Sequence, residues 1–293
     1  PGPMGIYLGY WHAVSAFTNC GLDIMGANAG FAKMAADPFV STVIVVTMFL
    51  GGVGFMAADD FLRHRSWSGL SLNSKLIFLM EAILIPLGTI IFYNLEGNNP
   101  ETLGGLSTME KWQSAVLMSV SSRLGGFAVF DIHSMLDQTV LLVMMFMFIG
   151  AAPVSTGGGI RTTTIGLLFL SLYAWIRGKK DVVIFHKHVD PDCLVKASNV
   201  FTLAVVITFI TAFLVFVFEP MSFDFEDVMF EAVSAFSTVG FSMGLTGEWN
   251  TPCKIVLMIA MYIGRIGVMT LAITFASHHS RQLKYPKENI IVG

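Results

Sequence analysis

Three short segments of the chain each place a glycine after a run of small and hydroxyl-bearing residues. AVSAFTNCGL at 13–22 recurs as AVSAFSTVGF at 232–241, with five identical residues and then the same three-residue gap to Gly21 and Gly240. A weaker copy, SVSSRLGGF at 119–127, places Gly126 105 residues after Gly21 and 114 before Gly240. Evenly spaced copies of this kind indicate an internal repeat.

The chemistry that these segments could perform is the coordination of a cation by backbone oxygens. Each copy contains about ten residues of amphipathic helix followed by a glycine loop. A helix of this length is too short to cross a membrane, so we expect each segment to return to the side from which it enters. A re-entrant helix would point the negative end of its dipole into the membrane, and the loop would present carbonyl oxygens. Glycine suits such a loop because it adopts φ values that disfavour residues with a Cβ.

The composition indicates a membrane protein. Hydrophobic residues make up 54% of the 293 residues and charged residues 13%, whereas about a quarter of the residues of a soluble globular domain are charged. The net charge of −3 points to no particular partner. We expect an all-α polytopic protein of the cell membrane, in contact with lipid and not with nucleic acid.

Four segments are candidate membrane spans. VFTLAVVITFITAFLVFVF at 200–218 is uncharged and long enough to cross a hydrocarbon core of about 30 Å. Three further candidates lie at 40–57, 75–93 and 255–277. The second contains Glu81 and the third contains Arg265, and polar residues inside a span usually face protein or water.

The distribution of charge predicts the two sides of the membrane, because short cytoplasmic loops are enriched in Lys and Arg. The segments predicted to be cytoplasmic carry Arg63, Arg65 and Lys75, then Arg177, Lys179, Lys180 and Lys187, then Arg281, Lys284 and Lys287. The segments predicted to face outward carry Glu96 and Glu101, then Glu219, Asp224, Glu226 and Asp227.

A fifth apolar stretch, at 139–176, is too long for one span. Its 38 residues, with Arg161 as the only charge, would extend roughly 57 Å as a helix. Its middle, GAAPVSTGGGIRTTT at 150–164, contains a proline and three consecutive glycines, which disfavour helix. Irregular backbone at membrane depth is tolerated where it is buried in protein or lines a water-filled cavity, so we expect a polar cavity here.

These motifs carry a family resemblance. TVGF at 238–241 looks like the TVG core of potassium-channel filters. The whole chain resembles the Trk/Ktr/HKT superfamily of potassium transporters, and most closely its Ktr-type membrane subunits. The segments that carry the resemblance are HAVSAFTNCG, RLGGF, STGGGIRTT and the closing KYPKENIIVG.

The resemblance implies four membrane helix–pore loop–membrane helix repeats around a central pore. On that basis the sequence begins just before the second pore loop, without the first repeat and the outer helix of the second. The implied units are 1–74 with the second pore loop, 75–188 with the third repeat and its broken inner helix, and 189–293 with the fourth repeat.

The resemblance also assigns site residues. The ion-binding filter would be formed by Asn19, Cys20, Gly21, Leu124, Gly125, Gly126, Thr238, Val239 and Gly240. The gate loop beneath it would contain Gly150, Ala151, Ala152, Pro153, Ser155, Thr156, Gly157, Gly158 and Gly159. Arg265 would face the cytoplasmic half of the pore. Three departures from the family pattern, at Leu22, Gly125 and Pro153, bear on filter rigidity and gating more than on ion type.

The implied ligands and partners follow from the same resemblance. K⁺ would be the permeant ion and Na⁺ an activator. A homodimer would associate with a cytoplasmic nucleotide-binding ring, and ATP or ADP would be bound by that ring. The best docking candidate is the basic segment RGKKDVVIFHKH at 177–188, although such runs also occur as simple membrane-flanking belts.

Several alternatives stay open on the sequence alone. Gly51, Gly52, Gly54 and Gly88 suit helix packing. Arg161 and Arg265 could pair with buried carboxylates or carbonyls, and Arg123 is expected to be a structural donor behind its glycine loop. Instead of a pore, the broken span could serve a secondary transporter of another solute. An intramembrane hydrolase using Ser155 would need a histidine in a neighbouring span, where we find none.

Overall fold

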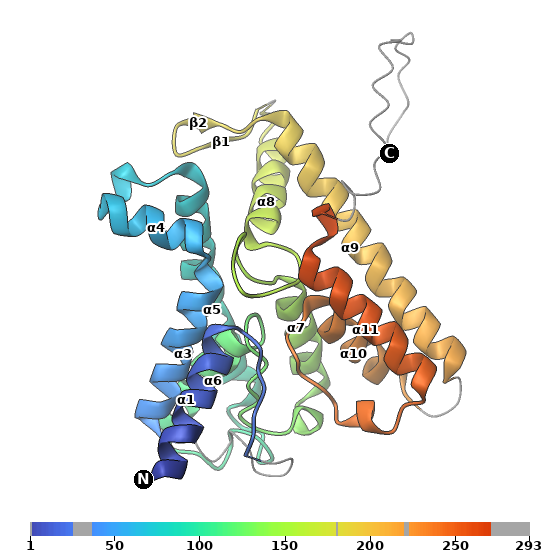
Figure 1. Cartoon of the computed structure of the whole chain (residues 1–293). Helices are drawn as coiled ribbons and strands as arrows, with labels where there is room; N and C mark the ends of the chain where they lie inside the picture. The colour runs from blue at the N-terminus through green and yellow to red at the C-terminus, as the bar shows by residue number, and fades with distance from the viewer. Residues whose placement is uncertain (1, 26–36, 180, 220–222, 271–293) are drawn as a thin grey trace.

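The computed structural model describes residues 2–25, 37–179, 181–219 and 223–270, and these residues are mostly helical (Figure 1). The α-helices are α1 (Pro3–Phe17), α3 (Pro38–Val53), α4 (Phe55–His64), α5 (Leu72–Glu96), α6 (Thr108–Ser121), α7 (Asp137–Phe148), α8 (Thr162–Ile176), α9 (Pro191–Phe218), α10 (Phe225–Ser237) and α11 (Thr251–Ile266). Short 3-10 turns are η1 (Trp67–Gly69), η2 (Ile132–Ser134) and η3 (Leu245–Gly247), and the strands β1 (Val183–Ile184) and β2 (Lys187–His188) form one antiparallel hairpin.

The helices include the predicted membrane spans. Among the described residues, α5 and α9 are long and apolar enough to cross a membrane, and α3 with α4 counts as a third span if the pair is taken as one bent element. The shorter helices α7 and α8 are also apolar and flank the predicted interruption at 150–164. The all-α polytopic fold expected from composition is thus confirmed.

Two predicted spans are broken by glycines. The segment 40–57 was expected to be continuous, but α3 ends at Val53 and α4 departs at 95°. Gly54 forms the bend with a φ of 86°, and a Cβ there would lie 2.5 Å from the carbonyl oxygen of Pro153. The helix in the segment 255–277 is likewise interrupted, at Gly267, which has a φ of 92°. The part of this segment beyond residue 270 lies outside the described residues.

The helices pack in two groups, one on each side of α7 and α8. Helix α1 packs against α3, α6 packs against α5, and both α10 and α11 pack against α9. Figure 1 shows α7 and α8 in the middle of the molecule, between the group of α1, α3, α5 and α6 and the group of α9, α10 and α11. The interrupted segment between α7 and α8 therefore lies where the groups meet.

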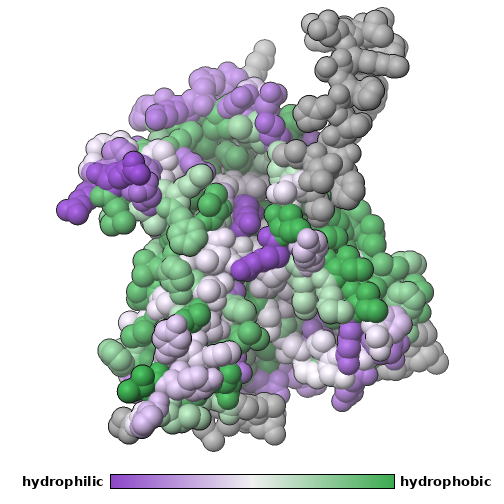
Figure 2. All heavy atoms as spheres, viewed as in Figure 1, coloured by the Kyte–Doolittle hydropathy of each residue, from purple (hydrophilic) through white to green (hydrophobic). Residues whose placement is uncertain are grey.

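The basic and the acidic residues that the sequence assigned to opposite sides of the membrane lie at opposite ends of the molecule where the structure describes them. Helix α4 and the β1–β2 hairpin lie at one end, where Figure 2 shows hydrophilic residues gathered, and hydrophobic residues cover the flanks. This end carries Arg63, Arg65 and Lys187. The connection 97–107, which contains Glu101, and the end of α9, next to Glu219, lie at the other end. Lys180, Arg281, Lys284 and Lys287 lie outside the described residues.

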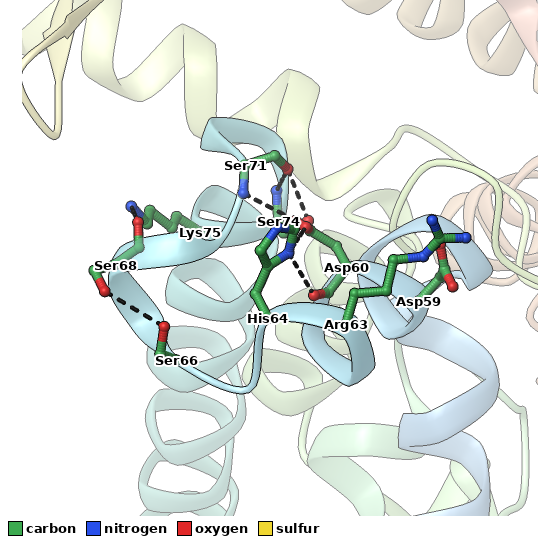
Figure 3. Close-up of polar contacts among 9 residues, drawn as sticks. All are labelled: Asp59, Asp60, Arg63, His64, Ser66, Ser68, Ser71, Ser74 and Lys75. Atoms are coloured by element: carbon green, nitrogen blue, oxygen red, sulfur yellow. Dashed lines mark hydrogen bonds and ion pairs between the residues drawn. The ribbon is translucent and has the colours of Figure 1, made fainter.

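Polar contacts hold the corner between α4 and α5 at the basic end (Figure 3). Asp60 accepts a hydrogen bond from the backbone N–H of Ser71 at 2.9 Å and pairs with His64 at 2.9 Å. Ser71 in turn caps α5 by accepting from the backbone N–H of Ser74 at 3.2 Å. These bonds satisfy backbone donors at the start of α5 and fix where that span begins.

A capping box starts α6 at the acidic end. Ser107 and Glu110 bond each other's backbone N–H, at 3.5 Å and 2.8 Å. The hydrogen bonds from the Ser107 side chain and backbone lower the pKa of the Glu110 carboxyl.

The packing role expected for four glycines is confirmed. A Cβ at Gly51 would overlap the carbonyl oxygen of Phe17, and one at Gly88 would overlap the hydroxyl of Ser119. Gly52 faces the Leu124 side chain, and Gly54 faces the carbonyl of Pro153. These contacts are possible only without a side chain, so the glycines set how closely the groups approach.

Gly51→Ala should destabilise the protein by about 1–3 kcal/mol, because the added methyl forces α1 and α3 apart. The measurement is thermal unfolding in detergent micelles. Gly9→Ala, in the exposed face of α1 with open space around the new Cβ, is the matched control and should leave the unfolding temperature unchanged or slightly raised. Equal unfolding temperatures for the two variants would contradict the packing role.

Candidate cation pathway

The three repeated segments fold as short helices that end in glycine loops. Helices α1, α6 and α10 contain 15, 14 and 13 residues, somewhat more than the ten expected, and each is still too short to cross a membrane. They lead into the first glycine loop (18–25), the second (122–130) and the third (238–244). The φ values of Gly21, Gly126 and Gly240 are 69°, 61° and 97°, in the region that glycine favours.

A serine of the preceding short helix braces each glycine loop by donating a hydrogen bond to a backbone carbonyl of that loop. The hydroxyl of Ser15 donates to the carbonyl of Leu22 at 2.9 Å, and that of Ser121 donates to Phe127 at 2.8 Å. In the third copy Ser234 donates to Phe241 at 2.5 Å. Each acceptor directly follows the loop glycine. The aligned serines were visible in the repeat, but their role follows only from these contacts.

The three loops meet one another through their glycines. A Cβ at Gly21 would overlap the carbonyl oxygen of Gly125, and one at Gly126 would overlap that of Val239. A Cβ at Gly240 would lie 3.6 Å from the carbonyl oxygen of Cys20. In each case the carbonyl belongs to the residue before the next loop's glycine. The structure thus brings Cys20, Gly21, Gly125, Gly126, Val239 and Gly240 together.

The remaining predicted filter residues lie beside this meeting point. Asn19 and Thr238 take equivalent left-handed conformations, with φ of 50° and 53°, at the ends of α1 and α10. Leu124 differs, because its backbone N–H continues the helical pattern of α6 by bonding the carbonyl of Val120 at 3.1 Å. Its side chain is buried against Gly52. The second loop is one residue shorter between its serine and glycine, so it has no counterpart of Asn19.

The predicted gate loop, between α7 and α8, folds back on itself. Ile149 and Ile160 pair as an isolated bridge at its neck. The guanidinium of Arg161 donates to the carbonyls of Gly157 at 2.7 Å and Ala152 at 3.4 Å. Pairing of Arg161 with carbonyls, one of the alternatives left open by the sequence, is therefore confirmed.

The same loop contacts two of the three glycine loops. The Thr156 hydroxyl lies 3.0 Å from the carbonyl of Phe17 and 2.8 Å from the side-chain amide of Asn19. On the other side, a Cβ at Gly158 would overlap the Thr238 hydroxyl, and Gly159 lies against Ser237. The gate loop therefore packs against the ends of α1 and α10.

Several hydroxyls near this contact are buried without a hydrogen-bond partner among the described residues. They are Ser155 in the gate loop and Ser237 and Thr238 at the end of α10. An unpaired buried hydroxyl is unfavourable in a dry site, so this locus suits water or a partly hydrated cation. Within the described chain the Ser155 hydroxyl forms no hydrogen bond to a side chain that could act as a general base.

Arg123 is a structural donor, as expected. Its guanidinium forms a two-pronged ion pair with Glu81 at 2.9 Å and 2.8 Å, and both side chains are almost completely buried. Its Nε lies 3.4 Å from the carbonyl of Ile149, at the neck of the gate loop. Arg123 thus connects α5, the second glycine loop and the gate loop, and its charge is neutralised away from the loop glycines.

Arg265 lies in the last turn of α11 with an exposed side chain. Ile266, the next residue, lines a cavity together with Arg161 of the gate loop's end. The adjacent Gly264 packs against the carbonyl of Phe236, as Gly51 packs against Phe17. Gly51 and Gly264 belong to a second repeat that was not predicted, GGVG at 51–54 and GRIG at 264–267. In both copies the last glycine bends the helix.

Two further buried groups escaped the sequence analysis. His12 and Glu231 occupy equivalent positions, three residues before the bracing serines of α1 and α10, and are 2% and 5% exposed. The signal that could have found them is the alignment of HAVS with EAVS.

A mostly helical membrane protein in which short helices end in glycine loops that meet one another beside an interrupted apolar segment has the architecture of a membrane transport protein. The family model TrkH, described as a cation transport protein, matches residues 4–284. The chain belongs to this family, and it is an integral protein of the plasma membrane.

Similar proteins include transporters named for potassium. A Ktr system potassium uptake protein B from Vibrio alginolyticus is 34% identical over 291 residues, covering 99% of this chain and 63% of the relative. The potassium/sodium uptake protein NtpJ of Enterococcus hirae is 32% identical over 296 residues, covering 99% of this chain and 64% of the relative. The chain thus spans a little under two thirds of their length.

A solved structure shares the fold. The potassium transporter TrkH from Vibrio parahaemolyticus superposes with a TM-score of 0.70 at 16% identity, covering 95% of this chain and 64% of that chain.

Arg123→Gln should destabilise the protein by about 3–5 kcal/mol, because it leaves the Glu81 carboxylate buried without its partner. The double variant Glu81→Gln/Arg123→Gln should recover part of that loss. Thermal unfolding in detergent measures both.

Arg63→Gln is the control, because Arg63 pairs with Asp59 at 2.8 Å on an exposed surface (Figure 3). Screening by solvent makes such a pair weak, so its loss should leave the unfolding temperature nearly unchanged. The inferred role of the buried pair is wrong if Arg123→Gln unfolds no earlier than Arg63→Gln.

Proposed function

We propose that the chain forms most of a potassium uptake pathway, in which K⁺ passes through the carbonyl oxygens of the glycine loops. The observation that carries the proposal is that three loops, far apart in sequence, present equivalent carbonyls to one another's glycines. Rings of backbone carbonyls replace the hydration shell of K⁺ in selective pores. The names of the relatives, which refer to potassium uptake, support K⁺ as the ion. No bond is made or broken in this function.

Within this proposal the filter comprises three units of one repeat. Residues 1–74, 75–188 and 189–293 each supply a short helix and a glycine loop. The helix C-termini point toward the loops, where their partial negative charge stabilises a cation. The braces from Ser15, Ser121 and Ser234 leave the carbonyls before the glycines available to the ion.

The gate loop would control passage beneath the filter. Its contacts with Phe17 and Asn19 on one side and Ser237 on the other would hold it in a closed position. Opening would require breaking the Thr156 contacts while Arg123 still bonds the Ile149 carbonyl at the neck and Arg161 still bonds the carbonyl of Gly157. Arg265 and Arg161 would add positive charge on the cytoplasmic side of the gate, which lowers the local concentration of cations when the gate is closed.

The partners proposed from the resemblance are a second copy of the chain and a cytoplasmic nucleotide-binding ring. The phrase "Ktr system" in the relatives' names is consistent with more than one component. The hairpin β1–β2 and the basic residues around it lie at the end away from the acidic connections, where such a ring would dock (Figure 1). Na⁺ would act as an activator, and nucleotide would bind to the ring.

Gly240→Ser should abolish the preference for K⁺ in rubidium uptake, because a side chain at a φ of 97° strains the loop that carries the Val239 carbonyl. The assay is saturable rubidium uptake at graded external K⁺, in transport-deficient cells that express the full-length gene product.

Gly247→Ser is the matched control, since Gly247 has open space around it and is not among the glycines with positive φ. Identical uptake in the two variants would refute the filter assignment. Absence of rubidium uptake in the unmodified protein would favour the alternative, a secondary transporter of another solute.

Replacing Lys179 and Lys180 with Glu should weaken binding of the regulatory ring, because the change reverses charge in the docking segment 177–188. Co-purification of the ring with the tagged membrane protein measures it. Glu101→Lys, at the opposite end of the molecule, is the control. If the ring co-purifies equally well with the Lys179→Glu/Lys180→Glu variant, the segment 177–188 is only a basic belt that flanks the membrane.

A further inference from the structure

A cavity of about 290 Å³ lies where the end of the gate loop meets three helices. Its walls come from Gly159, Ile160 and Arg161 of the loop, from α8 and α9, and from the end of α11. Helix α9 packs against both α8 and α11 (Figure 1). Pockets for small molecules usually measure about 300 to 1,000 Å³, so this cavity suits a compact ligand or one group of a larger ligand.

Two basic side chains and no carboxylate line this cavity, counting only the residues that the structure describes. Arg161 belongs to the end of the gate loop and Lys196 to α9, so the two charges come from different walls. Lys196 is exposed and forms no ion pair with another described residue. Positive charge on two sides of one cavity, without a neutralising carboxylate there, favours an anionic ligand.

The guanidinium of Arg161 has donors to spare. Its Nη1 donates to the carbonyls of Gly157 and Ala152, whereas its Nε and Nη2 have no hydrogen-bond partner among the described residues. Two such nitrogens form a planar fork that matches the oxygens of a phosphate. Arg161 is also the N-cap residue of α8, a helix of 15 residues, so the positive end of that helix dipole lies beside the same fork.

Other parts of the cavity wall are apolar, and they include Leu167, Val200 and Val268. Lys196 is five residues after Pro191, where α9 begins, or about 7.5 Å along the helix axis. The cavity is therefore near the basic end of the molecule, which the sequence predicts to be cytoplasmic. Basic pockets between membrane helices on that side bind the headgroups of anionic lipids.

We propose that this cavity is a binding site for a phosphate group, held by Arg161 and Lys196. The Nε and Nη2 of Arg161 bind two phosphate oxygens, and the ammonium group of Lys196 binds from α9. Two molecules carry this chemistry to the inner face of a membrane: an anionic phospholipid and a free phosphate ion. The inference goes beyond the proposed function and does not depend on which ion is transported. Because Arg161 also bonds the Gly157 carbonyl, the bound phosphate contacts the residue that holds the end of the gate loop.

Cys193 provides the readout, because it lines the same cavity and is exposed. The full-length gene product, purified in a non-ionic detergent, is treated with N-ethylmaleimide, and peptide mass spectrometry measures the labelling rate of each cysteine. Phosphatidylglycerol should slow the labelling of Cys193 by occupying the cavity. Labelling of Cys20, which is exposed in the first glycine loop, should stay unchanged.

Lys196→Gln should raise the phosphatidylglycerol concentration for half-maximal protection by about tenfold, because it removes one charge-assisted contact with the phosphate. Lys196→Arg keeps the charge and should keep the protection. Lys187→Gln is the matched control, since Lys187 is also exposed at the basic end but does not line the cavity. Rates with and without lipid are compared for each variant, so a change in the intrinsic reactivity of the thiol cancels.

Inorganic phosphate and diacylglycerol, which lacks the phosphate, complete the experiment. Protection by phosphatidylglycerol but not by inorganic phosphate identifies the ligand as an anionic lipid, whereas protection by inorganic phosphate identifies a free phosphate. The inference is overturned if neither compound protects Cys193, if diacylglycerol protects it equally well, or if Lys196→Gln is protected as well as Lys187→Gln. None of these outcomes bears on the rubidium uptake that tests the proposed function.

Discussion

The close approach of the three glycine loops is the constraint on which the rest of the structure depends. A loop at membrane depth exposes backbone carbonyls that have no partner in lipid, so it must be enclosed by protein. Here the loops enclose one another, and each uses a glycine to admit the carbonyl of its neighbour. A side chain at Gly21 or Gly126 would separate the loops, and no arrangement of the outer helices could compensate for that separation.

This constraint explains why so many polar groups are buried behind the loops. In the proposed filter the carbonyls would all be directed toward a cation and would repel one another, so the loops would have to be held against that repulsion. The serine braces, the contacts of His12 with Asp23 and of Glu231 with Met243, and the Arg123–Glu81 pair all lie next to the loops. A buried ion pair adds little stability by itself, but its directional bonds favour one geometry. In the second loop, which is one residue shorter, Arg123 provides this support.

The interrupted span between α7 and α8 is positioned by the same loops. Its backbone turns back within the protein, where Arg161 bonds two of its carbonyls and Thr156 contacts the end of α1. The bends at Gly54 and Gly267 have a related origin, since each follows a glycine that packs against the end of a short helix. The glycine loops, the interrupted segment between α7 and α8 and the bent helices therefore share contacts, so a displacement of one would alter the packing of the others.

The sequence by itself determined the membrane class, the helical spans, the three glycine loops and the break at 150–164. These features depend on local composition and on glycine and proline, which act wherever the chain places them. Only the tertiary structure decided that Arg123 pairs with Glu81, 42 residues away, and that Thr156 contacts Phe17, 139 residues away. It also decided the 95° bend after α3. Such contacts depend on which loops meet in space, and the pattern of residue types along the chain does not encode that meeting locally.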